Sequence, residues 1–206
     1  MRLYFVRHGE SEANVLHEVS NRGYKHPLTE NGRQQAAALA RSLAGVSVTR
    51  IYTSPLMRAV QTAEVLAAAL GAGFTMTSAL REYDCGVLEG RSDAACWEEH
   101  TRVREDWILR GDWGSRSAAG ESFLDIRARF EPFVKRLIAG KADHPDNLIV
   151  VGHGGLYITM LPIVLSNVSF AFAYEHEFPN TGYVLAETGP GGLMCVEWCG
   201  TPVEQD

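Results

Sequence analysis

The stretch NLIVVG, residues 147–152, is followed directly by His153-Gly154-Gly155. An unbroken apolar run of this length is typical of a strand buried on both faces of a sheet. Such a strand needs helices on both sides of the sheet, and residues 156–165 supply an apolar helical segment immediately after it. The stretch therefore predicts an α/β protein in which His153 lies at the carboxyl end of a buried strand.

Other parts of the chain repeat this pattern of strand and helix. Four further segments have the composition of strands: residues 2–6, 50–53, 183–186 and 193–198. The first ends in Arg7-His8-Gly9-Glu10 and the second in Ser54-Pro55. Because strands alternate with helices, we expect a three-layer α/β/α sandwich with a mostly parallel central sheet. Ligands of such folds bind at the carboxyl ends of the strands.

Helix start and stop signals support this architecture. Thr29 is the expected N-cap of the first long helix. Ser54 and Pro55 are expected as the N-cap and first residue of a second helix, which stops at Gly71. Apolar residues at helical spacing predict a third long helix over residues 121–138.

The stretch 84–120 interrupts the alternation. Residues 92–110 have helical composition, whereas 111–120 are rich in Gly, Ser and Ala. We interpret 84–120 as an inserted helical and loop cover over the site. Residues 1–206 are then expected to form one domain, since this length is ordinary for a single core.

The composition excludes several classes of protein. The 206 residues include 19 Lys and Arg against 25 Asp and Glu, a net charge of −6, which argues against nucleic acid or an anionic membrane as partner. No apolar run approaches the roughly 18–20 residues that span a bilayer, and residues 1–10 lack a signal peptide's apolar stretch, so we expect a cytoplasmic protein. The four cysteines match neither a disulfide framework nor a zinc site, and we expect no metal and no cofactor.

Four ordered motifs resemble those of the histidine phosphatase superfamily, the phosphoglycerate-mutase-like family. The motifs span nearly the whole chain, and each lies at an expected strand end or helix start. They are Arg7-His8-Gly9-Glu10-Ser11 with Asn14, Pro27-Leu28-Thr29-Glu30-Asn31-Gly32, Ser54-Pro55 with Arg58 and Thr62, and Gly152-His153-Gly154-Gly155. The resemblance implies a phosphoglycerate-mutase-like fold and a phosphoryl-transfer site.

The chemistry of these residue types fits phosphoryl transfer. Arg7 and Arg58 can each give bidentate hydrogen bonds to the phosphoryl oxygens. The proposed nucleophile is His8, which must be a neutral tautomer to form a phosphohistidine; we expect one ring nitrogen to donate to a backbone carbonyl in the turn with Gly9. A protonated His153 and helix-end N–H groups are expected to bind the same anion.

By resemblance, the proton for the leaving group comes from an acidic residue after the helix that begins near Arg58. The matching position is Glu82, which burial beside phosphate would make a suitable acid and then base. Asp84 is a competing candidate, and Glu89 is a third.

Other polar residues are candidates for binding substrate. Asn14 matches a family position that contacts the phosphoryl group. Asn21 and Arg22 lie in a loop that borders the substrate in the family. Gly154 offers a backbone N–H to the anion. Two further segments resemble ones that recur in the family: Gly120-Glu121-Ser122 and Asn180-Thr181-Gly182. A helix cap explains the first and a chain turn explains the second, so we leave both out of the catalytic set. The histidines outside the motifs are expected on the surface or in loops: His17, His26, His100, His144 and His176.

The reaction itself stays open between alternatives. The stretch from Glu82 to Gly90 resembles the phosphatase branch, which favours a metal-independent phosphomonoesterase acting on small phosphorylated metabolites. Arg102 and Arg104 could hold an anionic substrate tail, so a phosphoglycerate-mutase-type phosphotransferase or a sugar-bisphosphatase is an alternative. A noncatalytic phosphate-binding module is a second alternative. The oligomeric state cannot be predicted.

Overall fold

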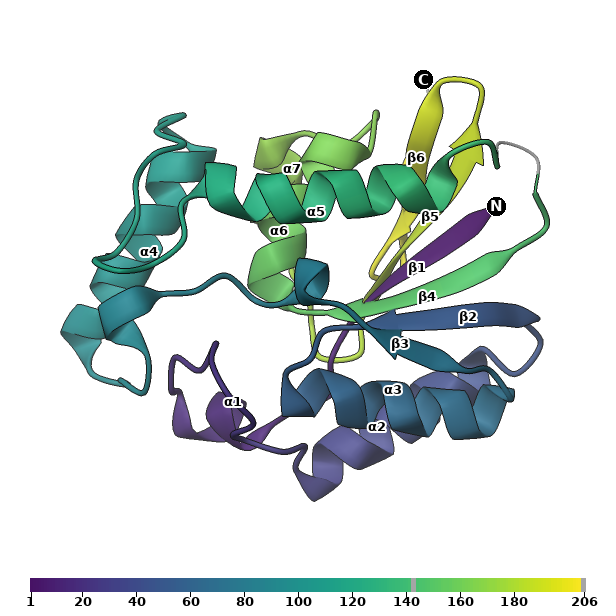
Figure 1. Cartoon of the computed structure of the whole chain (residues 1–206), viewed down its shortest axis with the longest axis horizontal. Helices are drawn as coiled ribbons and strands as arrows, with labels where there is room; N and C mark the ends of the chain where they lie inside the picture. Colours follow the sequence, from purple (N-terminus) through teal and green to yellow (C-terminus); the bar gives the residue numbers. More distant parts are fainter. Residues whose placement is uncertain (142–143, 205–206) are drawn as a thin grey trace.

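In the computed structural model, which describes residues 1–141 and 144–204, seven strands form one sheet (Figure 1). In order across the sheet they are β3 (Phe74–Met76), β2 (Val48–Thr53), β4 (Asn147–Gly152), β1 (Arg2–Arg7), β5 (Tyr183–Gly189), β6 (Gly192–Trp198) and β7 (Thr201–Pro202). The central position of β4 agrees with its unbroken apolar sequence.

The sheet is mixed, so the prediction of a mostly parallel sheet is wrong. β3, β2, β4 and β1 are parallel neighbours, whereas β5, β6 and β7 are each antiparallel to the strand before them in the sheet. The connection of β5 to β6 accounts for part of the difference: Gly189 pairs with Gly192, and only Pro190 and Gly191 lie between them. Parallel strands need a crossover of a dozen or more residues, so this short turn requires an antiparallel hairpin.

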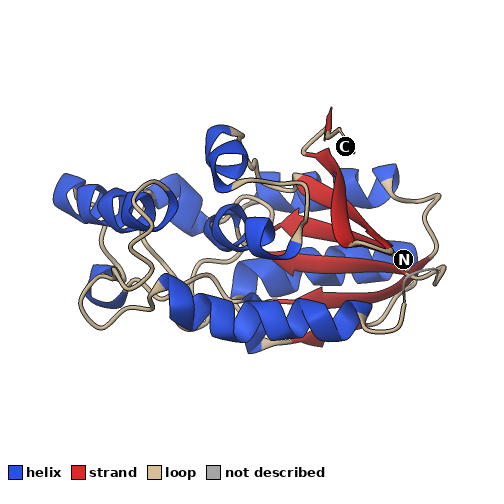
Figure 2. Cartoon of the chain, turned by 90° about the horizontal axis from the view of Figure 1, so that it is seen from above, coloured by secondary structure: helices blue, strands red, loops and turns tan. Residues whose placement is uncertain are grey.

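Helices cover both faces of the sheet (Figures 1 and 2). α2 (Glu30–Ser42) and α3 (Met57–Leu70) pack on one face, and α5 (Phe123–Ile138) and α6 (Gly154–Val164) on the other. Alternate residues of β4 enter the two cores: Leu148 and Val150 join the α5–α6 side, and Ile149 and Val151 the α2–α3 side. The predicted burial of this strand on both faces is confirmed.

Helix starts agree with the sequence at one position and differ at another. Thr29 caps α2 as predicted, since its hydroxyl oxygen accepts the N–H of Gly32. α3 begins at Met57 with Leu56 as N-cap, so the prediction that Ser54 and Pro55 open this helix is wrong. The Ser54 hydroxyl is instead 2.8 Å from Nε2 of His153, which ties it to the strand-end cluster.

The remaining helices lie around the carboxyl ends of the strands: α1 (Glu12–Leu16), the 3-10 helices η1 (Ser78–Leu80) and η2 (Gly86–Leu88), α4 (Ala94–Ile108) and α7 (Phe170–Glu175). α4 lies beyond the end of the sheet (Figure 1). Residues near the two ends of the stretch 84–120 are hydrogen-bonded to each other: Glu121 N donates to Asp84 O at 2.8 Å, and Val87 N to Ala118 O at 2.9 Å.

A close backbone contact holds the N-terminus of α2 against the loop after β1. A Cβ atom on Gly32 would collide with the carbonyl oxygen of Glu10. We expect Gly32→Ala to reduce the free energy of unfolding by about 1–3 kcal/mol, and so to lower Tm by roughly 2–10 °C. Gly45→Ala is the matched control, because no atom lies within 4 Å of its added Cβ. Equal thermal-unfolding midpoints for the two variants would contradict this contact.

Candidate active site

Two histidines meet where β1 and β4 end. The parallel register pairs Arg7 with Gly152, so the next residues, His8 and His153, leave the sheet side by side. The His8 N–H donates to Gly152 O at 3.1 Å, and the two imidazole centroids are 5.1 Å apart. Both side chains are buried.

The hydrogen bonds of His8 define its tautomer. Nδ1 lies 2.7 Å from Gly9 O, and Nε2 lies 3.1 Å from Nε of Arg58. Because arginine can only donate, Nε2 is the acceptor and Nδ1 carries the proton given to Gly9. Burial, followed by the charges of Arg58 and Arg7, holds the pKa of His8 well below its ordinary value. The predicted bond to a carbonyl in the Gly9 turn is confirmed, and His8 is neutral.

Arg7 and Arg58 are held by backbone carbonyls. Nη1 of Arg7 donates to Phe178 O at 2.6 Å, and Nη2 of Arg58 donates to Ser20 O at 2.8 Å. Within residues 1–141 and 144–204, neither guanidinium forms an ion pair, and Nε of Arg7 has no hydrogen-bond partner. Burial lowers the pKa of Arg58 to about 10, so it stays charged at neutral pH. Two cations whose hydrogen-bond partners are neutral groups therefore lie beside His8, and the carboxyl group of Glu82 interacts electrostatically with both.

His153 is also neutral, which corrects the prediction that it is protonated. Burial, then the neighbouring Arg58 and His8, holds its pKa well below the ordinary value. The hydroxyl of Ser54 accepts the N–H of Leu56 and can give its own proton to Nε2 of His153. Nδ1 then carries the ring proton, and it has no partner among the described residues. A neutral histidine can therefore still donate to an anion.

Glu82 faces the same cavity from the segment after η1. Its carboxylate accepts the N–H of Gly155 at 3.0 Å and that of Tyr83 at 3.1 Å. A Cβ on Gly155 would lie 2.9 Å from both carboxylate oxygens, so only glycine permits this approach. Burial raises the pKa of Glu82, although the two backbone N–H groups and Arg58 oppose the shift. The carboxyl group therefore holds a proton more readily than a surface glutamate.

The competing carboxylates are bound elsewhere. Asp84 forms an ion pair with Arg22 at 2.8 Å and accepts the N–H of Gly86. Glu89 accepts the backbone N–H groups of Asn21 and Arg22. Neither carboxylate lines the cavity that contains His8, whereas Glu82 does.

The cavity has a volume of about 400 Å³ and receives most of the predicted residues. Arg7, His8, Arg58, Glu82, Asn14, Asn21 and Gly154 all line it. His153 is fully buried beside His8 and is not one of the residues that line the cavity. Arg22 is the exception: it is exposed and bound to Asp84, so its predicted place at the substrate is not supported by the structure.

One wall of this cavity was predicted only in part, since Arg104 was named from the sequence as a possible contact to substrate but Trp97 and His100 were given no place there. Trp97, His100 and Arg104 of α4 all line it, so the prediction that His100 is a surface or loop residue is wrong. Their spacing of three and four residues places them on one helix face, a signal that the sequence did contain. The hydroxyl of Tyr83 is 2.8 Å from Nε2 of His100, and burial lowers the pKa of His100 to about 4.

Two other features of the described residues bear on function. No group of three or more His, Cys, Asp or Glu side chains is arranged there to hold a metal ion. None of the helices in the described ranges is both long enough and apolar enough to span a bilayer.

The fold and the site define an α/β protein with a cationic, histidine-containing cavity at its strand ends. Residues 3–201 match the model of the histidine phosphatase superfamily (branch 1), and the chain belongs to this family.

Similar proteins include a mutase-named sequence and phosphatase-named structures. A probable phosphoglycerate mutase GpmB of Salmonella choleraesuis (strain SC-B67) is 36% identical over 156 residues, which cover 75% of this chain and 70% of the relative. A mycobacterial glucosyl-3-phosphoglycerate phosphatase has a TM-score of 0.82 at 26% identity, covering 97% of this chain and 99% of the other. A putative alpha-ribazole-5'-P phosphatase from Escherichia coli has a TM-score of 0.79 at 24% identity, with 100% and 99% covered, which bears on the fold alone.

The buried neutral histidines make folding sensitive to acid. His100 titrates near pH 4 in the folded protein and near 6.5 in the unfolded chain. Between these values the unfolded state binds the additional proton, so stability falls as the pH falls, by up to about 1.4 kcal/mol per pH unit for this one group.

We therefore expect the free energy of unfolding of His100→Gln to fall less steeply from pH 6.5 to 5 than that of the wild type. Urea titrations at stepped pH measure the difference, and groups common to both proteins cancel. His17→Gln, at an exposed histidine, is the control and should follow the wild-type slope. Parallel slopes for wild type and His100→Gln would refute the buried neutral state of His100.

Proposed function

We propose that this chain is a metal-independent phosphomonoesterase that hydrolyses small phosphorylated metabolites through a phosphohistidine on His8. The observation that carries the proposal is the tautomer of His8: Nδ1 donates to Gly9 O, which leaves the Nε2 lone pair as the nucleophile. Arg58, which is buried, and Arg7, which is half-buried, form no ion pair with the described carboxylates and supply the charge that a phosphoryl dianion requires.

In the first step, Nε2 of His8 attacks phosphorus in line with the ester oxygen. The N–P bond forms as the P–O bond to the leaving group breaks. In the free protein Nε2 accepts a hydrogen bond from Arg58, and a phosphoryl oxygen would take over as acceptor when substrate binds. Nε of Arg7 and Nδ1 of His153 are further donors for the phosphoryl oxygens.

Glu82 supplies the proton that the departing alkoxide takes up. Burial raises the pKa of this carboxyl group, which favours its protonated, proton-donating form. Its carboxylate then removes a proton from water, the water oxygen attacks phosphorus, and the N–P bond breaks to release inorganic phosphate. Atoms and charge balance over the two steps, and Glu82 ends protonated again.

The first test is hydrolysis of p-nitrophenyl phosphate in the presence of a chelator, from pH 5 to 8. We expect the wild type to release phosphate and His8→Ala to lose at least about 10³-fold in rate, because without a nucleophile no covalent intermediate forms. Full activity in His8→Ala would disprove the mechanism. Phosphate binding without turnover in the wild type would instead indicate a phosphate-binding module.

A phosphoglycerate-mutase-type transfer or a sugar-bisphosphatase activity is the second candidate, and Arg104 favours it. Arg104 lines the cavity, and in the described part of the chain it forms no ion pair; its Nε has no hydrogen-bond partner there. Its guanidinium carbon lies 5.5 Å from the ring centroid of Tyr174. Arg102, two residues away, is paired with Glu99 and Asp106. A substrate with a second anionic group would therefore meet Arg104.

We expect Arg104→Met to raise KM for a phosphomonoester that carries a carboxylate, such as 3-phosphoglycerate, by roughly 10- to 100-fold, since a hydrogen bond to a charged group contributes about 1.5–3 kcal/mol. The KM for p-nitrophenyl phosphate should change little. Arg102→Met is the matched control, because it removes a paired arginine of the same helix. Equal effects of Arg104→Met on both substrates would exclude this second anion subsite.

A further inference from the structure

Glu82 lies on a segment that belongs to no strand or long helix, although the N–H of Gly155 in α6 binds its carboxylate. The chain from Arg81 to Cys85 runs between η1 and η2 without belonging to either. The position of the Glu82 carboxyl group therefore depends on what fixes the backbone on each side of it.

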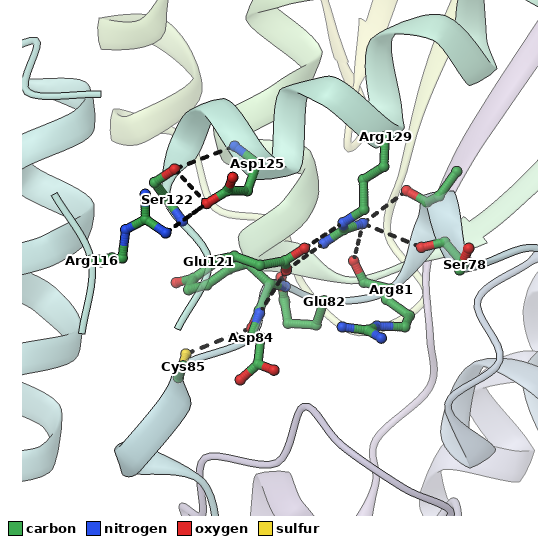
Figure 3. Close-up of polar contacts among 12 residues, drawn as sticks. Ser78, Arg81, Glu82, Asp84, Cys85, Arg116, Glu121, Ser122, Asp125 and Arg129 are labelled. Atoms are coloured by element: carbon green, nitrogen blue, oxygen red, sulfur yellow. Dashed lines mark hydrogen bonds and ion pairs between the residues drawn. The ribbon is translucent and has the colours of Figure 1, made fainter. Parts of the chain in front are cut away.

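Arg129 fixes the side that precedes Glu82. It projects from α5, and its Nη1 donates to the carbonyl oxygens of Ala79 and Arg81, both at 2.9 Å, with Ser78 O at 3.5 Å (Figure 3). These carbonyls belong to the C-terminal end of η1 and the residue that follows it, where a short helix leaves its acceptors unpaired. One guanidinium thus caps η1 and holds the residue before Glu82.

Glu121 fixes the side that follows Glu82. Its carboxylate accepts the N–H of Asp84 at 2.8 Å, while its own N–H donates to Asp84 O at 2.8 Å. The same carboxylate forms a bidentate pair with Arg129, with Nε at 2.9 Å and Nη2 at 3.0 Å. The two side chains are only 18% and 20% exposed, so solvent screens this pair less than a surface ion pair.

We propose that Arg129 and Glu121 are positioning residues that act as one clamp on the backbone around Glu82 and so aim its carboxyl group at the leaving oxygen. The inference rests on the proposed role of Glu82 as proton donor. The clamp spans the glutamate, because Arg129 binds the carbonyl of Arg81 and Glu121 binds the amide of Asp84. Glu121 directly precedes Ser122, the N-cap of α5, so both members of the clamp are fixed to the same helix.

The contacts of Ser122 show that the positioning role of Glu121 is distinct from capping α5. Ser122 and Asp125 form the capping box of α5, and Arg116 pairs with Asp125 at 3.0 Å (Figure 3). The side chain of Glu121 takes no part in that cap and points to Arg129 and Asp84 instead. Capping alone therefore leaves Glu121 unexplained.

The test compares kcat/KM for a poor and a good leaving group, glycerol 2-phosphate and p-nitrophenyl phosphate. An alkoxide needs the proton of Glu82, whereas p-nitrophenolate hardly does. We expect Glu82→Gln to lose about 10²- to 10⁴-fold on the alkyl ester. Arg129→Met and Glu121→Gln should each lose about 10- to 100-fold on it, as misplaced catalytic groups do, and less than about 3-fold on the aryl ester. The double variant should lose no more than either alone, because paired residues act as one unit.

Arg127→Met is the matched control: Arg127 lies on the same helix and pairs with Glu131 at 2.6 Å, away from Glu82. It should leave both esters unaffected. If Glu82→Gln discriminates between the esters but the folded clamp variants do not, the clamp is overturned and the proton donor stands. If Glu82→Gln shows no discrimination, both ideas fail together. Glu121→Gln, which keeps the side-chain size, provides the answer should Arg129→Met not fold.

Discussion

Arg58 is buried and Arg7 half-buried beside His8, and among the described residues their hydrogen-bond partners are backbone carbonyls and the His8 ring, not carboxylates. The rest of the site depends on this arrangement. In the described part of the chain, other arginines such as Arg22 and Arg129 pair with acidic residues. A carbonyl satisfies the hydrogen-bond donors of a guanidinium but leaves its full positive charge. Burying such a cation costs free energy, which an anion of matching charge would offset. The fold thus maintains a positive potential at its strand ends.

That potential also controls the protonation of the neighbouring groups. It adds to burial in keeping the pKa values of His8 and His153 low, so neither histidine competes with the arginines for the anion. At Glu82 the two effects oppose each other, since burial raises the pKa and Arg58 lowers it. Burial is the larger effect. One electrostatic arrangement therefore supports both a neutral nucleophile and a proton-carrying carboxyl group.

The residue pattern of the sequence predicted best those groups of the site that regular structure positions, whereas Glu82, on irregular backbone, was identified by resemblance to the family. His8 and His153 directly follow strands whose apolar runs can be recognised, and parallel pairing brings strand ends together whatever the loops do. His100 was assigned wrongly, and the structure does not support Arg22 at the substrate, because the positions of both side chains depend on packing between distant segments. Nothing local shows that Asp84 will bind Arg22 or that α4 will turn His100 toward the cavity. The sheet was wrongly predicted to be mostly parallel because the sequence does not show that β5 runs antiparallel to β1, a direction that tertiary pairing decides.

Catalytic groups in this fold are therefore held in two different ways. A ladder of backbone hydrogen bonds fixes His8 and His153, and such a ladder tolerates many side-chain sequences. Glu82 stands on irregular backbone, where positional accuracy must come from specific side chains such as Arg129 and Glu121. A substitution in that side-chain network can move the proton donor without disturbing the nucleophile. The segment from Glu82 onward is also continuous with the stretch that carries α4, so one part of the chain supplies both the proton donor and a wall of the cavity.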